Sequence, residues 1–168
     1  MIIRSERAGD VAQIREVNRQ AFGREDEAVL VDALREQGAV ICSLVAEKDG
    51  LVAGHVLFSP AILADGVTQW TVAGLGPVAV RPEFQRQGIG EMLIRAGLAV
   101  CVEEGYEVAV VLGHPEYYPR FGFRPSRQLG IHWEHDAPEE AFMVLALVPG
   151  ALQGKKGIIR YRPEFDGV

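Results

Sequence analysis

Apolar and polar residues follow two different periods in the first quarter of the chain. Residues 1–6 have the pattern of a short first strand. Helical spacing then predicts a helix that ends near Gly23 and a second helix over about 25–37. Asp10, with Gln13 three residues later, has the pattern of a reciprocal N-cap for the first helix. The inward positions are Val11, Ile14, Val17, Ala21 and Phe22 in the first helix and Leu30, Val31 and Leu34 in the second.

The middle of the chain is typical of antiparallel strands. Residues 40–47 and 51–59 are both strand-like, and Lys48-Asp49-Gly50 between them is a hairpin turn signal. Asp65-Gly66 marks a second turn, which precedes a long strand at about 68–80. The pattern therefore predicts an antiparallel meander of strands.

Helical spacing returns after the long strand. It runs over 88–104, and Gly105 is a good helix stop. Residues 107–112, EVAVVL, are almost continuously apolar, which is typical of a strand buried on both faces in a parallel pair. Strand 68–80, the helix and strand 107–112 therefore form a βαβ unit with a right-handed crossover. The predicted fold class is α/β (α+β), with a central mixed, mostly antiparallel sheet and flanking helices.

Pro77 predicts an irregularity in the long strand, because proline cannot donate a ladder hydrogen bond. Gly74 and Gly76 weaken pairing further. We expect strand 68–80 to bend or bulge there and to part from strand 107–112. Such a splayed parallel pair exposes backbone N–H and C=O groups, which suit a ligand that carries amides.

The last third of the chain has shorter apolar segments. A turn or short helix is expected at 115–121, a strand near 123–126 and a last strand at 142–148. The tail, 149–168, has scattered apolar residues and is expected to pack along the surface. We find no second domain, so residues 1–168 are expected to form a single one.

Residues 81–93, RPEFQRQGIGEML, join a strand to a helix through two glycines and a basic residue. Helix N-termini have unpaired N–H groups and a partial positive charge, so they attract phosphate. Gly88 and Gly90 remove Cβ atoms where an anion must touch the backbone, and Arg86 adds a positive charge. The loop Gln85–Gly90 therefore reads as a pyrophosphate cradle. The alternative is a helix start at which glycine only permits a tight turn.

Two better-known phosphate motifs do not fit this loop. The dinucleotide fingerprint needs a third glycine, and Leu93 stands at that position. The P-loop needs Gly-Lys-Ser/Thr, which the chain lacks.

Charge and composition exclude some classes of protein. The 168-residue chain has a net charge of −6, which disfavours nucleic-acid binding through a basic surface. No apolar run is long enough for a membrane span, and the first residues lack the apolar core of a signal peptide. Cys42 and Cys101 fall on apolar faces and are expected to be buried thiols, with a disulfide as the minor alternative. These features together indicate a cytoplasmic protein.

Residues 78–90, VAVRPEFQRQGIG, resemble the acetyl-coenzyme A binding motif Gln/Arg-x-x-Gly-x-Gly/Ala of the GCN5-related N-acetyltransferase (GNAT) superfamily. The matching residues are Gln85, Gly88 and Gly90, placed between a strand and a helix. The segment HPEYYPRFGF at 114–123 resembles the second signature of this superfamily. The resemblance covers most of the chain. It is strongest to the YhbS-like subgroup of predicted acetyltransferases, which shares a tail like residues 161–165.

The resemblance implies a GNAT fold with acetyl-coenzyme A (acetyl-CoA) as co-substrate. It implies that the pyrophosphate of CoA is bound by backbone amides of the cradle and that strand 76–80 pairs with the pantetheine arm. It also implies that the Val78 N–H stabilises the oxyanion. The implied cofactor-binding residues are Val78, Val80, Gln85, Arg86, Gln87, Gly88, Ile89, Gly90 and Glu91.

Acetyl transfer to an amine needs a base for the amine and a proton donor for the leaving thiolate. The resemblance implies that Tyr118 is the donor, because it precedes Gly122-Phe123 in a Tyr-x-x-x-Gly-Phe pattern; Tyr117 could take its place. The strand carboxylate that many family members use as base is absent here. His114 is the nearest candidate base, since its ordinary pKa suits the task. The alternatives are that His114 is only an N-cap or loop histidine, or that a water relay removes the proton without a dedicated base.

Other polar residues have simpler interpretations. The spacing of His132, Glu134, His135 and Asp136 matches no standard ligand set, so we expect no metal. His55 is expected to be a hydrogen-bonded strand histidine. The acidic residues 25–27 either line the acceptor side or start a helix.

The predicted function is acetyl-CoA-dependent transfer of an acetyl group to a primary amine, by direct attack in a ternary complex. The expected acceptor is a small-molecule or peptide amine, with no nucleic-acid or membrane partner, and a homodimer would be common for the family. The alternative is a non-catalytic acyl-CoA-binding sensor or regulatory module, which the missing strand carboxylate favours.

Overall fold

A computed structural model describes residues 1–168 and contains one nine-stranded mixed sheet with three α-helices. The main path of the sheet is β1-β2-β3-β4-β5-β8-β6, and β9 pairs with both β3 and β7. The strands are β1 (Ile2–Ser5), β2 (Cys42–Lys48), β3 (Leu51–Ala64), β4 (Gln69–Val80), β5 (Val108–Leu112), β6 (Arg124–Pro125), β7 (Ile131–Trp133), β8 (Phe142–Ala146) and β9 (Gly157–Arg160). The helices are α1 (Val11–Phe22), α2 (Asp26–Glu36) and α3 (Ile89–Glu103).

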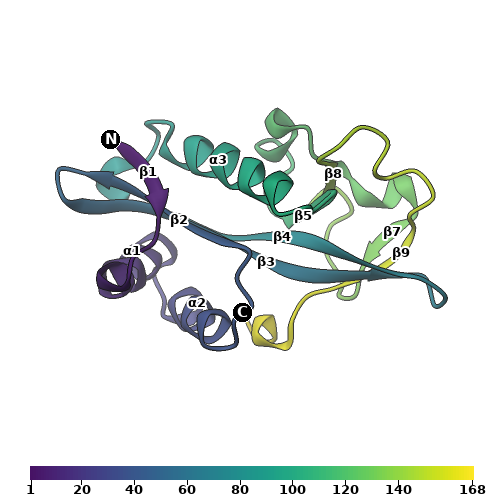
Figure 1. The fold of residues 1–168 in the computed structure, drawn as a ribbon, viewed down its shortest axis with the longest axis horizontal. Coiled ribbons are helices and arrows are strands. Elements are labelled where there is room, and N and C mark those ends of the chain that lie inside the picture. Colours follow the sequence, from purple (N-terminus) through teal and green to yellow (C-terminus); the bar gives the residue numbers. More distant parts are fainter.

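Helices cover both faces of the sheet (Figure 1). Helix α3 lies on one face, where Ile89, Leu93 and Ile94 are buried against β2, β3 and β4. Helices α1 and α2 lie on the other face and bury residues such as Val17 and Leu34. The expected meander, the βαβ unit and the mixed sheet are all present.

The sheet splits between β4 and β5, which are the only parallel neighbours on its main path. Strand β4 pairs with β5 at two positions, Ala73 with Ala109 and Gly74 with Val110. Just beyond, the register between β3 and β4 shifts between the pairs Phe58–Leu75 and Val56–Val78. Residues 76 and 77 of β4 therefore lie opposite a single residue of β3, which is a bulge. The predicted bend at Pro77 and the predicted parting of the two strands are confirmed.

The C-terminal segment differs from the expectation of a surface tail. Residues 157–160 form β9, which pairs antiparallel with the far end of β3 and parallel with β7. Ile159 is completely buried in this arrangement. Strand β3 is also longer than expected, because its second half pairs with β4 and β9. These strand segments form because they pair with residues far away in sequence. The local spacing of apolar residues could not predict that pairing.

Asp10 is the N-cap residue of α1, as predicted, but its side chain makes no capping hydrogen bond to this helix and the reciprocal pair with Gln13 is absent. The carboxylate of Asp10 accepts two hydrogen bonds from the Arg4 guanidinium, at 2.7 and 3.0 Å, and one from the backbone N–H of Arg7. The side chain of Gln13 accepts a hydrogen bond from the backbone N–H of Val52. Asp10 therefore joins the start of α1 to β1, and Gln13 joins α1 to β3, which lies far away in sequence.

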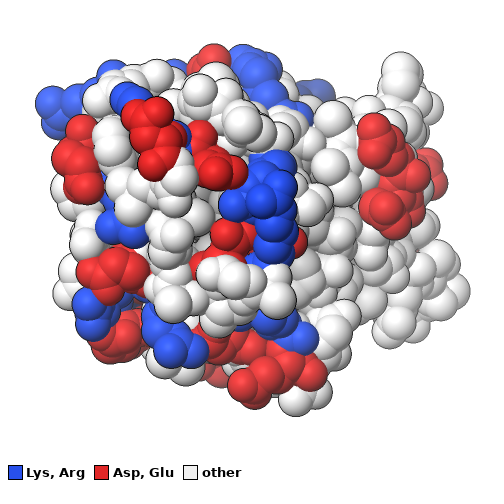
Figure 2. Space-filling view, turned by 60° about the vertical axis from the view of Figure 1, so that its left-hand side comes forward, with Lys and Arg blue, Asp and Glu red and all other residues white.

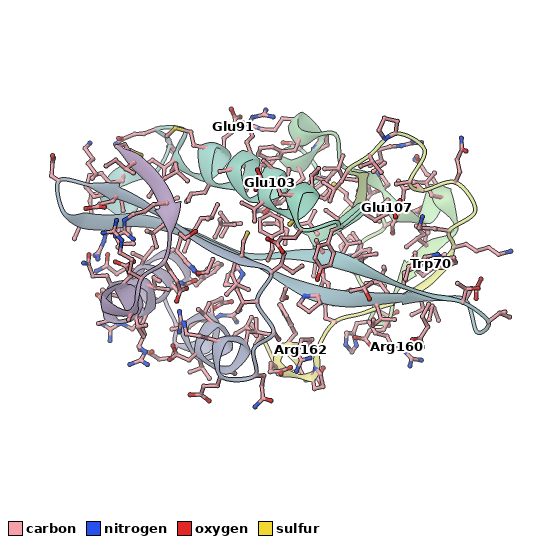
Figure 3. All side chains as sticks on the ribbon, in the orientation of Figure 1. Trp70, Glu91, Glu103, Glu107, Arg160 and Arg162 are labelled. Carbon is pink, nitrogen blue, oxygen red and sulfur yellow. The ribbon has the colours of Figure 1, made fainter.

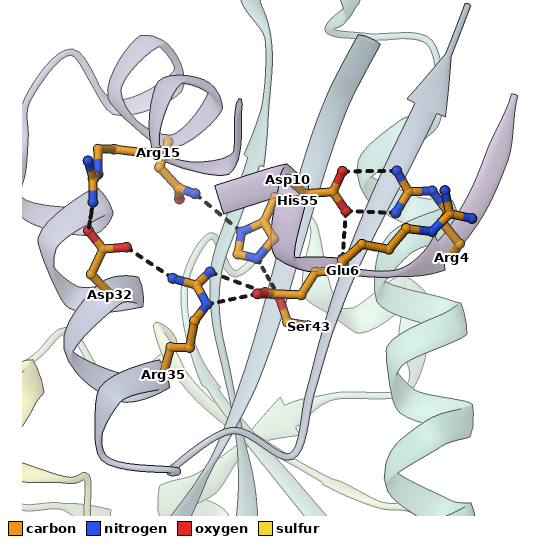
Figure 4. Close-up of polar contacts among 10 residues, drawn as sticks. Arg4, Glu6, Asp10, Arg15, Asp32, Arg35, Ser43 and His55 are labelled. Carbon is orange, nitrogen blue, oxygen red and sulfur yellow. Dashed lines mark hydrogen bonds and ion pairs between the residues drawn. The ribbon is translucent and has the colours of Figure 1, made fainter. Parts of the chain in front are cut away.

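His55 is a buried, hydrogen-bonded histidine, as expected (Figure 4). Its Nδ1 lies 3.2 Å from the side-chain nitrogen of Asn18, and its Nε2 lies 2.8 Å from the hydroxyl of Ser43. Since the Asn18 nitrogen donates, Nδ1 accepts and Nε2 carries the hydrogen. The Ser43 hydroxyl donates to Glu6, which also pairs with Arg35 at 2.7 Å. Burial lowers the pKa of His55 to about 4.

This buried histidine makes stability depend on pH. The unfolded chain, in which the pKa of histidine is 6.5, binds more protons than the folded protein between pH 6.5 and about 4. The His55 contribution is therefore complete above pH 6.5 and falls as pH decreases, by about 3 kcal/mol in total. Urea unfolding at a series of pH values should show this slope. A His55→Asn variant should lose it, whereas the exposed His135→Asn control should keep it. An unchanged slope in His55→Asn would contradict the assignment.

The surface is mixed in charge. Figure 2 shows acidic and basic side chains interspersed on the face turned toward the viewer. None of the helices combines the length and the apolar composition that crossing a membrane requires. Cys42 and Cys101 are buried free thiols, as predicted.

Candidate active site

The predicted phosphate cradle is the loop between β4 and α3, and its backbone is strongly curved. Arg86 and Gly88 both have positive φ, 63° and 83°. Gly88 is the N-cap of α3, with no side chain capping the helix, so the first N–H groups of α3 are left for a ligand. Gln85 supports the turn, because its side-chain amide donates to the Val80 carbonyl at 3.0 Å. This backbone is suited to holding an anion.

Gly90 keeps one side of the cradle open. It lies in the first turn of α3, and a Cβ placed on it would be 3.4 Å from the Tyr117 hydroxyl and 3.9 Å from the Val80 side chain. The absent side chain therefore leaves space between the helix end, β4 and the Tyr117 ring. A larger residue would project into that space.

Basic residues surround the entrance. The Arg120 guanidinium lies 4.3 Å from the centre of the Tyr117 ring and 3.6 Å from the Glu91 carboxylate. Arg95 lies 3.7 Å from the same carboxylate. Figure 3 shows Glu91 on the outer side of α3, near the start of the helix. Together with the exposed Arg86 these groups favour an anion at the helix N-terminus.

A cleft of about 720 Å³ runs from the cradle along the separated part of β4. This volume is in the usual range for small-molecule sites. The cleft brings together nearly all the predicted site residues; Gln87 belongs to the loop but does not line the cleft. Its lining residues are Ala21, Phe22, Val78, Val80, Phe84, Gln85, Arg86, Gly88, Ile89, Gly90, Glu91, His114, Tyr117, Tyr118 and Arg120.

The two adjacent tyrosines occupy different parts of the cleft. The Tyr117 hydroxyl lies above Gly90, beside the cradle. The Tyr118 ring lies against Gly113, where a Cβ would overlap it, and packs edge-on against Phe123 at 5.9 Å. Burial raises the pKa of Tyr118 to about 12. The sequence left the two tyrosines interchangeable, whereas the structure separates them.

His114 also lines the cleft, in the turn after β5. Its side chain is exposed, and its backbone carbonyl accepts hydrogen bonds from the N–H groups of Tyr117 and Tyr118 at 3.1 and 3.4 Å. The turn therefore fixes His114 and the tyrosines relative to one another. The imidazole is free to contact solvent or a substrate.

Several cleft residues were not expected from the sequence. Ala21 and Phe22 come from the end of α1, and Phe84 comes from the turn before the cradle. Phe22 was assigned to the core by its helical spacing, but its side chain is 40% exposed. The sequence pattern gave no indication that this large apolar side chain would be exposed beside the cleft.

The acidic residues 25–27 mainly start a helix. Asp26 and Glu27 lie in the first turn of α2, and Glu27 is paired with Arg24. Asp26 lines a separate hollow of about 250 Å³ together with Glu164 and the C-terminal residues. These residues do not line the main cleft.

A helix N-terminus that opens into a split between two parallel strands defines the GNAT fold of CoA-dependent acyltransferases. The chain belongs to this family: the family model described as an acetyltransferase (GNAT) domain matches residues 2–126. The resemblance expected from the sequence is therefore confirmed, and the protein is an acyltransferase of the N-acetyltransferase type.

Curated relatives agree with this assignment. The uncharacterized N-acetyltransferase YhbS of Escherichia coli strain K12 is 36% identical over 167 residues, which is 99% of each chain. The uncharacterized N-acetyltransferase YjhQ of the same strain is 39% identical over 134 residues, which cover 78% of this chain and 74% of YjhQ.

Two solved structures are similar over nearly the whole chain. E. coli YhbS in complex with CoA has a TM-score of 0.92 and 35% identity, covering 98% of this chain and 91% of YhbS. A GNAT family acetyltransferase from Brucella melitensis in complex with acetyl-CoA has a TM-score of 0.80 and 40% identity, covering 98% and 97% of the two chains.

Proposed function

We propose that this protein transfers the acetyl group of acetyl-CoA to a primary amine by direct attack in a ternary complex. The observation that carries the proposal is the cleft, which joins a phosphate cradle to a split in the sheet and is lined there by the partly buried Tyr118. Both similar structures described above hold CoA or acetyl-CoA, which supports the same ligand here.

In this proposal the cradle binds the pyrophosphate of CoA. The N–H groups from Arg86 to Glu91 point at the phosphate oxygens, with Gln85 and Gln87 holding the loop in shape. The pantetheine arm lies along β4 beyond the bulge and pairs with the backbone of Val78 and Val80, as a strand would. The acetyl group then reaches the inner end of the split.

The amine nitrogen attacks the carbonyl carbon of the thioester. The C–N bond forms, the C–S bond breaks, and the thiolate of CoA leaves. The Val78 N–H donates to the carbonyl oxygen as negative charge develops there. Tyr118, with its pKa of about 12, keeps its proton at neutral pH and donates a hydrogen bond to the leaving sulfur.

His114 accepts the proton that the amine loses, directly or through one water. Its exposed imidazole lines the cleft and belongs to the same turn as Tyr118. His114→Asn should lower kcat/KM about tenfold to a hundredfold at neutral pH, with a smaller loss at high pH, where more of the amine is already unprotonated. The measurement is a pH profile of kcat/KM, with exposed His135→Asn as control. Identical profiles for His114→Asn and wild type would remove His114 from this role.

The function itself is tested by incubating the protein with acetyl-CoA and a panel of primary amines. The panel contains a polyamine, an amino sugar, a peptide with a free N-terminus and a lysine peptide. We expect thiol release that depends on one class of amine, with an acetylated amine in the mass spectrum and no acetyl group on the protein. Binding of acetyl-CoA without amine-dependent thiol release would favour the non-catalytic alternative. An acetylated protein intermediate would contradict direct attack.

A further inference from the structure

Tyr161 lies where the C-terminal segment passes under the sheet. It directly follows β9, whose Arg160 pairs with Ile62 of β3, and it precedes a 3-10 turn at Pro163–Phe165. Figure 3 shows the neighbouring side chains of Arg160 and Arg162 below the sheet, on the side that carries α1 and α2. This segment is not part of the cleft described above.

The Tyr161 ring packs on Gly74, the residue after which β4 and β5 part. A Cβ on Gly74 would lie 3.2 Å from Cε1 and 3.6 Å from Cδ1 of Tyr161, so the glycine allows the close approach. Gly74 pairs with Val110, and no residue of β4 beyond it pairs with β5. The ring therefore closes the narrow end of the split from below.

The Tyr161 hydroxyl is buried and has no hydrogen-bond partner in the protein. Burial raises the pKa of this phenol above its ordinary value, and the neighbouring Tyr118 raises it further. The hydroxyl therefore keeps its proton and remains a donor. A buried hydroxyl without a partner costs free energy, so such a group in a native structure calls for an explanation. A ligand that accepts the bond would provide one.

Aromatic neighbours hold the Tyr161 ring in place. Its centre lies 5.0 Å from that of Phe165, 6.2 Å from that of Trp133 and 6.3 Å from that of Phe142. The ring is thus contacted by β7, by β8 and by the turn that follows it. The direction of the hydroxyl is fixed before any ligand arrives, which favours a precise contact.

Tyr118 and Tyr161 approach the split from opposite faces of the sheet. Tyr118 packs with the core under α3, which contains Ala73 and Ala109. Tyr161 packs with the core that contains Val72 and Val110, and side chains one residue apart on a strand point to opposite faces. Tyr118 lies against Gly113, just after β5, and Tyr161 lies against Gly74 of β4, so each ring contacts one of the two strands that part there. The space between them is the end of the split.

We propose that the Tyr161 hydroxyl donates a hydrogen bond to the carbonyl oxygen of the bound acetyl group. The proposal rests on the proposed function, which brings the thioester sulfur to Tyr118 and leaves the acetyl group at the narrow end of the split. Tyr161 and the Val78 N–H then hold the same oxygen, and both contacts strengthen as charge develops on it. The C-terminal segment thereby completes the acetyl site.

Calorimetry with two ligands tests the contact without any knowledge of the amine. Tyr161→Phe should weaken binding of acetyl-CoA about three- to tenfold and leave binding of CoA unchanged, because CoA has no acetyl oxygen. The unfolding temperature of the variant should equal or exceed that of wild type, since no hydrogen bond within the protein is lost. Tyr106→Phe, which removes a hydroxyl at the far end of α3, should change neither affinity.

Three results would overturn the inference. The first is an unchanged affinity of Tyr161→Phe for acetyl-CoA, and the second is an equal loss for acetyl-CoA and CoA. The third is a lower unfolding temperature, which would mean that the hydroxyl has a partner within the protein. The proposed function is tested separately, by thiol release from the wild-type protein. It fails if no amine increases that release.

A kinetic measurement gives an independent readout once an amine substrate is known. Tyr161→Phe should lower kcat tenfold to a hundredfold, because the contact is strongest in the transition state. The KM of the amine should change by less than about threefold. A rise in that KM at unchanged kcat would place Tyr161 in amine binding and overturn its role on the acetyl oxygen.

Discussion

Tyr118→Phe should lower kcat by about a hundredfold to a thousandfold and change KM little, because the hydroxyl acts on the sulfur only as the C–S bond breaks. The phenylalanine ring keeps the packing against Gly113 and Phe123, so the fold should be retained. Steady-state kinetics with the amine identified by thiol release would measure the effect. Circular dichroism and the unfolding temperature would confirm that the variant is folded.

Tyr117→Phe is the matched control, because it removes a neighbouring hydroxyl that lies beside the cradle. It should alter the affinity for acetyl-CoA more than kcat. The opposite pattern, with a large loss of kcat in Tyr117→Phe and little in Tyr118→Phe, would exchange the roles of the two tyrosines. This is the alternative that the sequence left open.

Gly90→Glu should weaken acetyl-CoA binding by at least about a hundredfold. The new carboxylate would project into the space where the pyrophosphate is proposed to bind and would repel it at short range. Gly90 has ordinary helical geometry, and a glutamate in the first turn of a helix favours the helix, so the fold should be retained. Calorimetric titration with acetyl-CoA measures the loss.

Gly9→Glu is the control for the change in net charge, because Gly9 is exposed and nothing lies within 4 Å of its Cβ position. It should bind acetyl-CoA as wild type does. Gly90→Ala should lose less affinity for acetyl-CoA than Gly90→Glu, because its single methyl group makes no more than van der Waals contacts with the Tyr117 hydroxyl and the Val80 side chain. Equal affinities of Gly90→Glu and wild type would place the phosphates elsewhere.

The features that the sequence predicted best are those made by local chemistry. The spacing of apolar residues defined the three helices and the central strands to within a few residues, apart from the second half of β3. Pro77 predicted the bulge, since a missing N–H disrupts pairing wherever it occurs. The two glycines of the cradle predicted an open helix N-terminus, because their effect on the backbone is also local.

Features that depend on partners outside the element itself were missed. Asp10 looked like a helix cap, but Arg4 and the backbone of Arg7 compete for its carboxylate. The pairing of β9 with β3 and β7 joins segments far apart in sequence. For that reason Tyr161, which the tail pattern placed on the surface, reaches the split in the sheet. The glycine at position 74 was read only as weakening the strand, although it also makes room for this ring.

Hydrogen exchange at backbone amides, measured with and without excess CoA, tests the central claim most directly. The claim is that the cleft between the cradle and the split in the sheet is the CoA site. We predict slower exchange with CoA at the amides of residues 85–91 and at those of β4 beyond the bulge, residues 78–80. The hairpin of β2 and β3 around Asp49 should be unaffected. Protection confined to other segments, or no change at residues 85–91, would contradict the account.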